Sequence, residues 1–220
     1  MAKFPFKNGD RILFQGDSIT DCGRQSDPYG IGQGYPAMVK AFLTVAAPGV
    51  KIEVVNRGSS GDKSVDLVNR WQTDCIDLAP THVSIMIGVN DIWRRFDGRV
   101  AEAIALPDYT AYYRRLIETC VHANIRNLIL MTPTTINVDP AHPSNVMCGE
   151  YANVVEGFAR EYGATLVPAR DRIWRAVASG PNVKFWLPDG VHPSAAGHAV
   201  LAAAWLEAVG VLSVAKAGKS

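Results

Sequence analysis

The sequence predicts an α/β protein, a single domain in which a five-stranded parallel sheet lies between two layers of helices as an α/β/α sandwich. Three observations carry this prediction. Short apolar runs alternate with longer segments of helical spacing, as in repeated strand-helix units. At 220 residues the chain suits one domain that removes roughly 70% of its unfolded surface from water. No internal repeat, low-complexity tract or interdomain linker divides it.

Apolar runs of strand length recur along the chain, separated by segments long enough for a crossover helix. Parallel strands joined by right-handed crossovers stack into one sheet with helices on both faces. The predicted strands are Arg11–Gln15, Lys51–Asn56, His82–Ile87, Asn127–Met131 and Thr165–Val167.

The segments between these runs have the apolar spacing of helices. The last of them carries a broad apolar stripe from Ala195 to Val209, and Pro193 suits its first turn. The predicted helices are Pro36–Ala46, Val65–Asp77, Pro107–Ala123, Met147–Tyr162 and Pro193–Val209.

Two long irregular stretches, Cys22–Tyr35 and Met131–Asn145, follow predicted strands and should border the active face of the sheet. We expect one domain over residues 1–220, with its core at about 11–209. The small, polar tail at 215–220 is predicted to be flexible.

Charge and hydropathy exclude several classes of partner. With 22 Lys and Arg against 21 Asp and Glu, the formal charge is +1, so no long-range field would attract nucleic acid or an anionic membrane. The N-terminus lacks the apolar stretch of a secretory signal, and no run approaches the ~20 residues of a membrane span. We therefore expect a cytoplasmic protein.

The four cysteines are scattered and form neither a C-x-x-C pair nor a metal-ligand spacing, so we expect free thiols. Cys75 and Cys120 lie in helical patterns and are predicted to be small core residues. Cys22, four residues past Ser18, is a rival nucleophile without a histidine nearby in the sequence.

Four segments that carry chemically useful side chains each follow a strand or precede the last helix. Parallel connectivity brings the carboxyl ends of strands to one rim, where ligands bind in open α/β sheets. The segments are Gly16-Asp17-Ser18, Asn56-Arg57-Gly58-Ser59-Ser60-Gly61, Gly88-Val89-Asn90-Asp91 and Asp189-Gly190-Val191-His192.

Acyl transfer needs a nucleophile, a base and a group that orients the base. Ser18 is the candidate nucleophile and His192 the candidate base, because Asp189 lies three residues before it and can accept from one ring nitrogen. The other histidines are expected to be structural or solvated; they are His82, His122, His142 and His198.

The same chemistry needs donors aimed at the developing oxyanion. Candidates are the Ser18 amide, the Gly61 amide and the side-chain amide of Asn90. Asp17 and Asp91 can pin their loops by accepting backbone hydrogen bonds, and Asp17 is also grouped with the substrate-binding residues because it precedes the nucleophile. Asn90 also suits a simple turn cap.

These four blocks, in this order, resemble those of the SGNH hydrolases, also called GDSL esterases, whose fold is flavodoxin-like. The likeness spans roughly Ile12 to Val209. It implies a triad of Ser18, Asp189 and His192. It also implies an oxyanion hole of the Ser18 amide, Gly61 and Asn90, with Gly58 as the other glycine that can fit the motif.

A closer likeness is to the intracellular acetyl xylan esterases of this family. The segments that carry it run from Gly16 to Arg24, from Val83 to Arg94, from Ile129 to Pro133 and from Val191 to His198. The likeness implies removal of acetyl groups from short xylo-oligosaccharides or other acetylated sugars, no metal or organic cofactor, and a homo-oligomer. Acyl thioesters and lysophospholipids, which other family members hydrolyse, are the alternative substrates.

Aromatic and basic residues near the blocks are candidate substrate readers. Tyr35, Trp93 and Trp186 are predicted to line the pocket, although each also suits the core. Arg94 is predicted to bind sugar hydroxyls or a carboxylate, with a solvated arginine as the alternative. With no inserted lid domain, the site should be shallow and favour short acyl groups.

Two other classes of function remain as alternatives. A metal-dependent phosphoesterase could use Asp17, Asp21, Asp91, Asp189 and His192, but the Asp-x-His and Gly-Asn-His clusters of two-metal sites are absent. A nucleotide-binding module would need glycine-rich phosphate motifs that the chain lacks, and the Gly30–Gly34 run has the wrong spacing. No Gly-x-Ser-x-Gly elbow supports an α/β-hydrolase.

Overall fold

Five parallel strands form the central sheet, in the order β2-β1-β3-β4-β5. The computed structural model describes residues 4–213. This order, with β1 between β2 and β3, is that of flavodoxin-like sheets, so the predicted fold class is confirmed. The strands are β1 (Arg11–Gly16), β2 (Glu53–Asn56), β3 (His82–Met86), β4 (Asn127–Met131) and β5 (Thr165–Val167).

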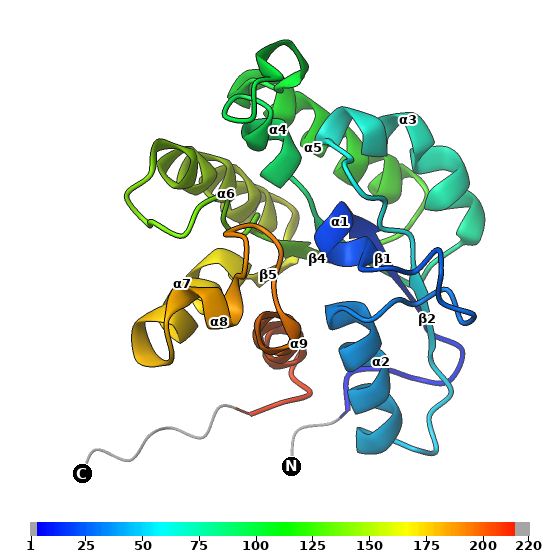
Figure 1. Ribbon diagram of the computed structural model, residues 1–220. Coiled ribbons are helices and arrows are strands. Elements are labelled where there is room, and N and C mark those ends of the chain that lie inside the picture. The colour runs from blue at the N-terminus through cyan, green and yellow to red at the C-terminus, as the bar shows by residue number, and fades with distance from the viewer. Residues whose placement is uncertain (1–3, 214–220) are drawn as a thin grey trace.

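Helices cover both faces of the sheet and complete the three layers (Figure 1). One face carries α3 (Ser64–Asp74), α5 (Leu106–His122) and α6 (Pro143–Tyr162). The other carries α2 (Tyr35–Ala46) and α9 (Ala195–Ala208), which pack on each other, while α7 (Ala169–Ser179) packs beside α9. Right-handed crossovers from a central strand in two directions produce this division.

Short helices in the connecting segments were not predicted from the sequence. They are α1 (Ser18–Asp21), α4 (Val89–Trp93) and α8 (Val183–Trp186), with 3-10 turns η1 (Ile76–Leu78) and η2 (Val100–Glu102). The longer α7 was missed as well. Segments of four or five residues carry too little periodicity for recognition, because one helical turn spans 3.6 residues.

Two of the predicted helices differ from the structure by three or four residues at one end. The helix expected from Met147 begins at Pro143, because the His142 side chain accepts a hydrogen bond from the Ser144 amide and caps it. The helix expected to reach Asp77 ends at Asp74 and passes into η1. The earlier start of α6 shortens the loop that follows β4.

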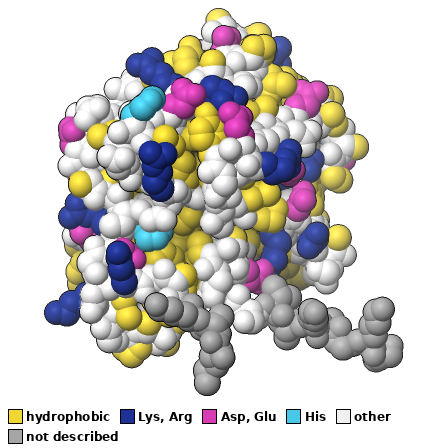
Figure 2. All heavy atoms as spheres, turned by 180° about the vertical axis from the view of Figure 1, so that it is seen from behind, with side chains coloured by type: hydrophobic (Ala, Val, Ile, Leu, Met, Phe, Trp, Pro, Cys, Tyr) yellow, Lys and Arg dark blue, Asp and Glu magenta, His cyan; other side chains and the backbone are white. Residues whose placement is uncertain are grey.

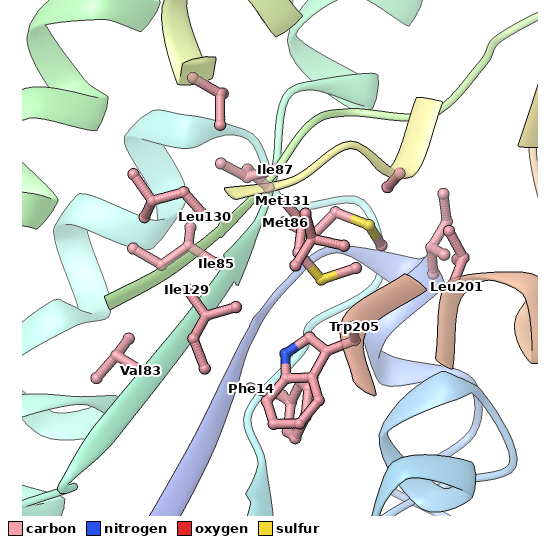
Figure 3. Close-up of a cluster of buried hydrophobic side chains, with 14 of the residues drawn as sticks. Phe14, Val83, Ile85, Met86, Ile87, Ile129, Leu130, Met131, Leu201 and Trp205 are labelled. Atoms are coloured by element: carbon pink, nitrogen blue, oxygen red, sulfur yellow. The ribbon is translucent and has the colours of Figure 1, made fainter. Parts of the chain in front are cut away.

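Aliphatic and aromatic side chains fill the space between the sheet and its helices. Figure 3 shows Trp205 of α9 beside Phe14 of β1, and their ring centroids are 5.4 Å apart. The Trp205 indole also donates to the buried Ser84 hydroxyl at 3.1 Å. Burial of such large side chains from every strand is the main source of stability for a sheet of this kind.

The register of the sheet aligns the ends of β1, β2 and β3. Phe14 of β1 pairs with Asn56 of β2, and Gly16 pairs with Met86 of β3. The segments that follow these strands therefore leave the sheet at the same edge. Ser18 begins α1 at the end of β1, next to β3, and the connections from β1 and from β3 leave in opposite directions at this point, where ligands bind in open sheets.

Charged side chains of both signs are interspersed on the face seen in Figure 2, with apolar patches between them. Within residues 4–213, no helix combines the length and hydropathy needed to cross a membrane. The predicted flexible tail at 215–220 lies outside the described residues.

Candidate active site

A chain of hydrogen bonds joins Ser18 to His192 and His192 to Asp189. Ser18 Oγ lies 2.9 Å from His192 Nε2, and His192 Nδ1 lies 2.7 Å from Asp189 Oδ2. Ser18 and His192 are 174 positions apart in the sequence, so only the fold brings them together. The geometry suits transfer of the hydroxyl proton to the imidazole while the carboxylate holds its other nitrogen.

The turn from Asp189 to His192 orients the carboxylate. Asp189 Oδ1 accepts from the amides of Val191 at 2.9 Å and His192 at 2.7 Å, while Oδ2 faces the ring. Partial burial would raise the pKa of Asp189, but hydrogen bonds from the His192 ring and the two amides outweigh it and lower the pKa below its usual value. Asp189 therefore stays ionised beside the imidazole.

Close packing at the end of β1 explains why Gly16 precedes the nucleophile. A Cβ on Gly16 would lie 2.3 Å from Thr20 Oγ1 and 2.4 Å from the Met86 carbonyl oxygen. Asp17 then caps α1, because its Oδ1 accepts from the Ile19 amide at 3.0 Å. The glycine and the cap together turn the chain so that Ser18 begins a helix at the rim.

Asp17 is a buried carboxyl directly beneath the nucleophile. Asp17 was predicted to bind the substrate, but only 1% of its surface is exposed, so it is not placed to contact one. Its carboxylate caps α1 instead. Burial raises the pKa of Asp17 to about 7, against the opposing effect of the Ile19 hydrogen bond. The Asp91 charge acts in the same direction as burial.

Asn56, at the end of β2, ties the far end of α1 to its surroundings. Its Nδ2 donates to the carbonyls of Thr20 at 2.7 Å and Ile31 at 2.8 Å. Its Oδ1 accepts from the Gly58 amide at 2.8 Å. One buried side chain thus joins the helix that carries Ser18 to the loop after α1 and to the loop after β2.

The candidate oxyanion donors lie on the segments that follow β1, β2 and β3, whose ends are aligned in the sheet. Asn90 Nδ2 donates to the Asp62 carbonyl oxygen at 3.0 Å, which holds its side chain beside the loop that contains Gly61 and leaves its second N–H hydrogen available. Within residues 4–213, the backbone amides of Ser18 and Gly61 donate no hydrogen bond. Uncommitted N–H hydrogens of this kind are what a developing oxyanion requires.

The structure distinguishes the two glycines that can fit the motif. The Gly58 amide is already bonded to Asn56, and a Cβ on Gly58 would lie 2.3 Å from the Asp21 nitrogen. Gly61 has φ +89, a left-handed conformation that favours glycine, and a Cβ there would lie 3.8 Å from Arg94 Nη2, an ordinary contact distance. Gly58 serves close packing, and Gly61 has the free amide.

Asp91 pins α4 to the start of α3. Both of its carboxylate oxygens lie 3.1 Å from the Ser64 amide, and the Ser64 hydroxyl donates to Oδ1 as well. Burial raises the pKa of Asp91 to about 6, while the Ser64 hydrogen bonds oppose that shift. These contacts fix the helix that carries Asn90, as the anchoring hypothesis for Asp91 expected.

Thr135, in the loop after β4, supports the histidine turn and was missed from the sequence. Its hydroxyl donates to the Gly190 carbonyl oxygen at 2.8 Å, between Asp189 and His192. Asn145 of α6 orders this loop by accepting from the Ile136 amide at 2.9 Å. Polar residues after a predicted strand were the available signal, but threonine is too common in loops for that signal to be specific.

Trp93, which was predicted to line the pocket, lies beside His192. Its ring centroid is 6.0 Å from that of His192 in an edge-on arrangement. The adjacent Arg94 is 6% exposed, and its guanidinium bonds Asp97 at 2.9 Å and approaches the Gly61 carbonyl at 3.5 Å. The charge of Arg94 is therefore paired within the protein rather than presented to solvent.

Two aromatic side chains predicted to line the pocket are placed elsewhere. Tyr35 is fully buried, its hydroxyl lies 3.0 Å from Thr20 Oγ1, and its ring stacks on His198. The indole of Trp186 packs against Gly180 at the end of α7. Both side chains are near the motifs in the sequence, but they pack inside the fold.

Cys22, the rival nucleophile, does meet a histidine in space. Its Sγ lies 3.4 Å from His198 Nε2, while His198 Nδ1 accepts from the Tyr35 amide at 3.1 Å. That second bond leaves the proton on Nε2, so His198 cannot remove the thiol proton. Burial lowers the pKa of His198 to about 4 and raises the pKa of the Cys22 thiol, and neither shift favours a thiolate.

The other predicted structural residues occupy ordinary positions. His142 caps α6, His82 starts β3 and His122 is exposed at the end of α5. Cys75 and Cys120 are buried with their sulfurs 4.0 Å apart, and all four cysteines are free thiols.

The carboxylates that a two-metal phosphoesterase would use are engaged within the fold. Asp21 Oδ2 accepts from the Ser60 hydroxyl at 2.7 Å, and Asp17 and Asp91 accept from backbone amides. In the described part of the chain, no group of three or more His, Cys, Asp or Glu side chains is placed to hold a metal ion.

Comparison with known proteins identifies the relatives of this chain. A family model described as the GDSL-like lipase/acylhydrolase family matches residues 14–200. An acetylxylan esterase of Geobacillus stearothermophilus is 38% identical over 213 residues, which cover 92% of this chain and 95% of that protein.

Solved structures give the same result. The crystal structure of Axe2, an acetylxylan esterase from Geobacillus stearothermophilus, matches with a TM-score of 0.88 and 35% identity over 94% of this chain and 97% of that one. LAE5, described as an alpha/beta hydrolase enzyme from the metagenome of Lake Arreo, Spain, matches with a TM-score of 0.89 and 30% identity over 95% and 99%.

Three further matching structures are described as catalytic mutants of Axe2. One replaces a serine with alanine, one an aspartate and one a histidine, and their TM-scores to this chain are 0.89, 0.86 and 0.87.

Proposed function

Because the chain belongs to the GDSL-like lipase/acylhydrolase family, we propose that it is a serine esterase that removes acetyl groups from short xylo-oligosaccharides through an acyl-enzyme on Ser18. The protein is a carboxylic ester hydrolase by this membership. The single observation that carries the mechanism is the hydrogen-bonded chain from Ser18 through His192 to Asp189.

Acylation begins when Ser18 Oγ attacks the ester carbonyl carbon and its proton passes to His192 Nε2, 2.9 Å away. The carbonyl oxygen becomes an oxyanion that accepts from the Ser18 amide, the Gly61 amide and Asn90 Nδ2. The ionised Asp189 stabilises the imidazolium through Nδ1. The bond to the sugar oxygen then breaks, and His192 returns its proton to that oxygen, which leaves as a hydroxyl.

Deacylation repeats the sequence with water. His192 Nε2 takes a proton from water as the oxygen attacks the acetyl carbon on Ser18, and the same donors receive the second oxyanion. The bond between the acyl carbon and Ser18 Oγ breaks, the proton on His192 passes to Oγ, and acetic acid leaves and gives its remaining proton to the solvent. The cycle returns every proton and needs no group beyond water and the side chains named.

The substrate proposal is supported by the acetylxylan esterase relatives and by Trp93. Flat apolar faces suit sugar rings, and Trp93 lies edge-on to the catalytic imidazole. Serine, aspartate and histidine are also the residue types replaced in the catalytic mutants of Axe2, which supports the assignment of Ser18, Asp189 and His192.

A direct comparison of substrates tests the proposal. Acetylated xylo-oligosaccharides, a short acyl thioester and a lysophospholipid are supplied separately, and the released acid is measured with wild-type protein and with Ser18→Ala. We expect the highest kcat/KM on the acetylated sugar and no release above background with Ser18→Ala. Preference for a long acyl chain would contradict the sugar-ester proposal, and acid release by the Ser18→Ala variant would contradict the role of Ser18.

Location and assembly rest on the resemblance to intracellular acetyl xylan esterases. We propose a cytoplasmic homo-oligomer whose single domain, with its core at about 11–209, carries the activity. The exposed apolar side chains Phe42 and Val45 of α2 suit a contact between copies. Cell fractionation and sedimentation of the purified protein test the two statements, and a secreted or monomeric protein would contradict them.

A further inference from the structure

The Arg70 guanidinium joins α3 to the end of β1 and to the loop that contains Gly61 and Asp62. Its Nε donates to Asp62 Oδ2 at 2.7 Å, and its Nη2 donates to the Gly16 carbonyl oxygen at 3.3 Å. Its Nη1 donates to Gln15 Oε1 at 2.9 Å and to Asp74 Oδ2 at 3.1 Å. The side chain is 19% exposed, so most of these contacts are shielded from water.

The end of β1 and the loop that contains Asp62, both bound by Arg70, each carry or support a candidate oxyanion donor. Gly16 ends β1 two residues before Ser18, whose amide is one donor. Asp62 directly follows Gly61, whose amide is the second donor. The Asp62 carbonyl also accepts from Asn90 Nδ2 at 3.0 Å and so places the third.

We propose that Arg70 is a positioning residue that sets the relative placement of the three oxyanion donors; this inference rests on the proposed esterase function. The planar guanidinium presents several N–H groups in a fixed fork, so it can hold a carboxylate and a carbonyl at fixed separation. An ammonium group is a point charge on a flexible stem and cannot reproduce that geometry. Small errors in donor placement are costly in catalysis, because the donors must meet the charge where it develops.

The charges around Arg70 fit this role. Burial raises the pKa of Asp62, and the hydrogen bond from Arg70 opposes that shift. Arg70 therefore favours an ionised Asp62, whose side chain anchors the Gly61 loop to α3. Asp74 is also on α3 and binds Arg70 without touching either loop through its side chain, so it steadies the guanidinium from behind.

The test measures kcat and KM for acetyl-ester hydrolysis in Arg70→Met and Arg70→Lys, alone and combined with Asn90→Ala. We expect Arg70→Met to lower kcat by about 10- to 100-fold with KM within about threefold, since the donors act mainly in the transition state. Once Asn90 is removed, the further loss should shrink to about threefold or less, because the two residues act through one feature. Arg70→Lys should recover only a small part of kcat.

Arg172→Met is the matched control. Arg172 joins α7 to α9 through Glu207 at 2.9 Å, is 27% exposed and contacts no part of the site. We expect it to lower Tm as Arg70→Met does and to leave kcat unchanged. If kcat falls equally in the control, or if Arg70→Lys restores wild-type kcat, Arg70 serves only stability and the inference is wrong.

The outcomes also separate this inference from the proposed function. Suppose that the wild type is active and depends on Ser18, but that the kcat losses of Arg70→Met and Asn90→Ala multiply in the double variant. That result would overturn the positioning role of Arg70 and leave the proposed function standing. A wild type that hydrolyses no acetyl ester, or does so without Ser18, would overturn the proposed function and the inference together.

Discussion

Two histidines lie in contrasting surroundings, one at the amino ends of the strands (the amino edge of the sheet) and one at their carboxyl ends (the carboxyl edge). At the amino edge, His82 lines a cavity of about 690 Å³, its Nδ1 lies 2.9 Å from Thr81 Oγ1 and its ring packs edge-on to Phe6. At the carboxyl edge, His192 lies between Ser18 and Asp189. Burial lowers the pKa of His82, although the Asp10 charge opposes that shift, and within residues 4–213 its ring forms no hydrogen bond to a carboxylate.

The contrast teaches that the hydrogen-bond partners of a histidine, and not the size of the cavity beside it, identify the candidate base in this fold. The amino edge has space and a neutral imidazole, but the imidazole faces a hydroxyl that also bonds the Arg11 backbone. The carboxyl edge has an aligned base, a hydroxyl and uncommitted amides. The proposed chemistry lies there because the carboxyl ends of parallel strands and the switch point of the topology coincide.

Replacing the two histidines gives the largest difference between the edges. His192→Ala should lower kcat by about 10⁴- to 10⁶-fold, because it removes the base and its link to Asp189. His82→Ala should leave kcat within about twofold of the wild-type value. Steady-state release of acetate measures both, and equal losses from the two substitutions would remove the distinction between the edges.

Asn90→Ala tests whether the carboxyl edge also supplies the oxyanion donors. We expect kcat to fall by about 10²- to 10³-fold with little change in KM, since the donor acts mainly in the transition state. The check is a full rate profile against substrate concentration. A rise in KM at constant kcat would make Asn90 a binding residue instead.

Asp17→Asn tests the buried carboxyl beneath the nucleophile. The native carboxyl stays protonated up to pH about 7, while the unfolded chain ionises from about pH 4, so wild-type stability should fall as pH rises through this window. Asparagine caps helices as well as aspartate does and carries no charge. The variant should gain on the order of 2–4 kcal/mol relative to wild type by pH 7.

Urea unfolding at several pH values measures this gain. The advantage of the Asp17→Asn variant should be near zero at pH 4 and constant above about pH 8. A stability difference that does not change between pH 4 and pH 7 would show that the native carboxyl ionises normally.

Thr135→Val gives the smallest expected effect and probes the support of the histidine turn. Loss of the hydrogen bond to the Gly190 carbonyl should cost about 1 kcal/mol of stability and lower kcat by about two- to tenfold. Thr134→Val is the matched control, because the Thr134 hydroxyl is buried without a partner within residues 4–213. That control should be neutral or slightly stabilising, and a larger kcat loss in it than in Thr135→Val would contradict the account.

Sequence patterns predicted the strands and the rim because both depend on local periodicity. The run from Arg11 to Gln15 reads as a strand in isolation, and right-handed crossovers then place helices on both faces of a parallel sheet. The association of Ser18 with His192 was also predictable, because topology assigns both segments to one edge. The comparisons with relatives confirm the family and the class of reaction.

Contacts between distant side chains explain what the sequence could not reveal. Tyr35 was expected at the pocket, but its ring stacks on His198 of a helix 163 positions away. Cys22 meets that same histidine although none lies near it in the sequence. Arg70 and Thr135 likewise carry no motif, and their roles follow only from the carbonyl groups that the fold places before them.

Covalent labelling of the nucleophile tests the central claim most directly. The protein is treated with a fluorophosphonate reagent, digested, and the modified residue is identified by mass spectrometry, with His192→Ala treated in parallel. We predict one adduct, on Ser18, formed quickly in the wild type and at least about 10²-fold more slowly without the histidine. An adduct on Cys22 or another serine, with Ser18 unmodified, would contradict the account.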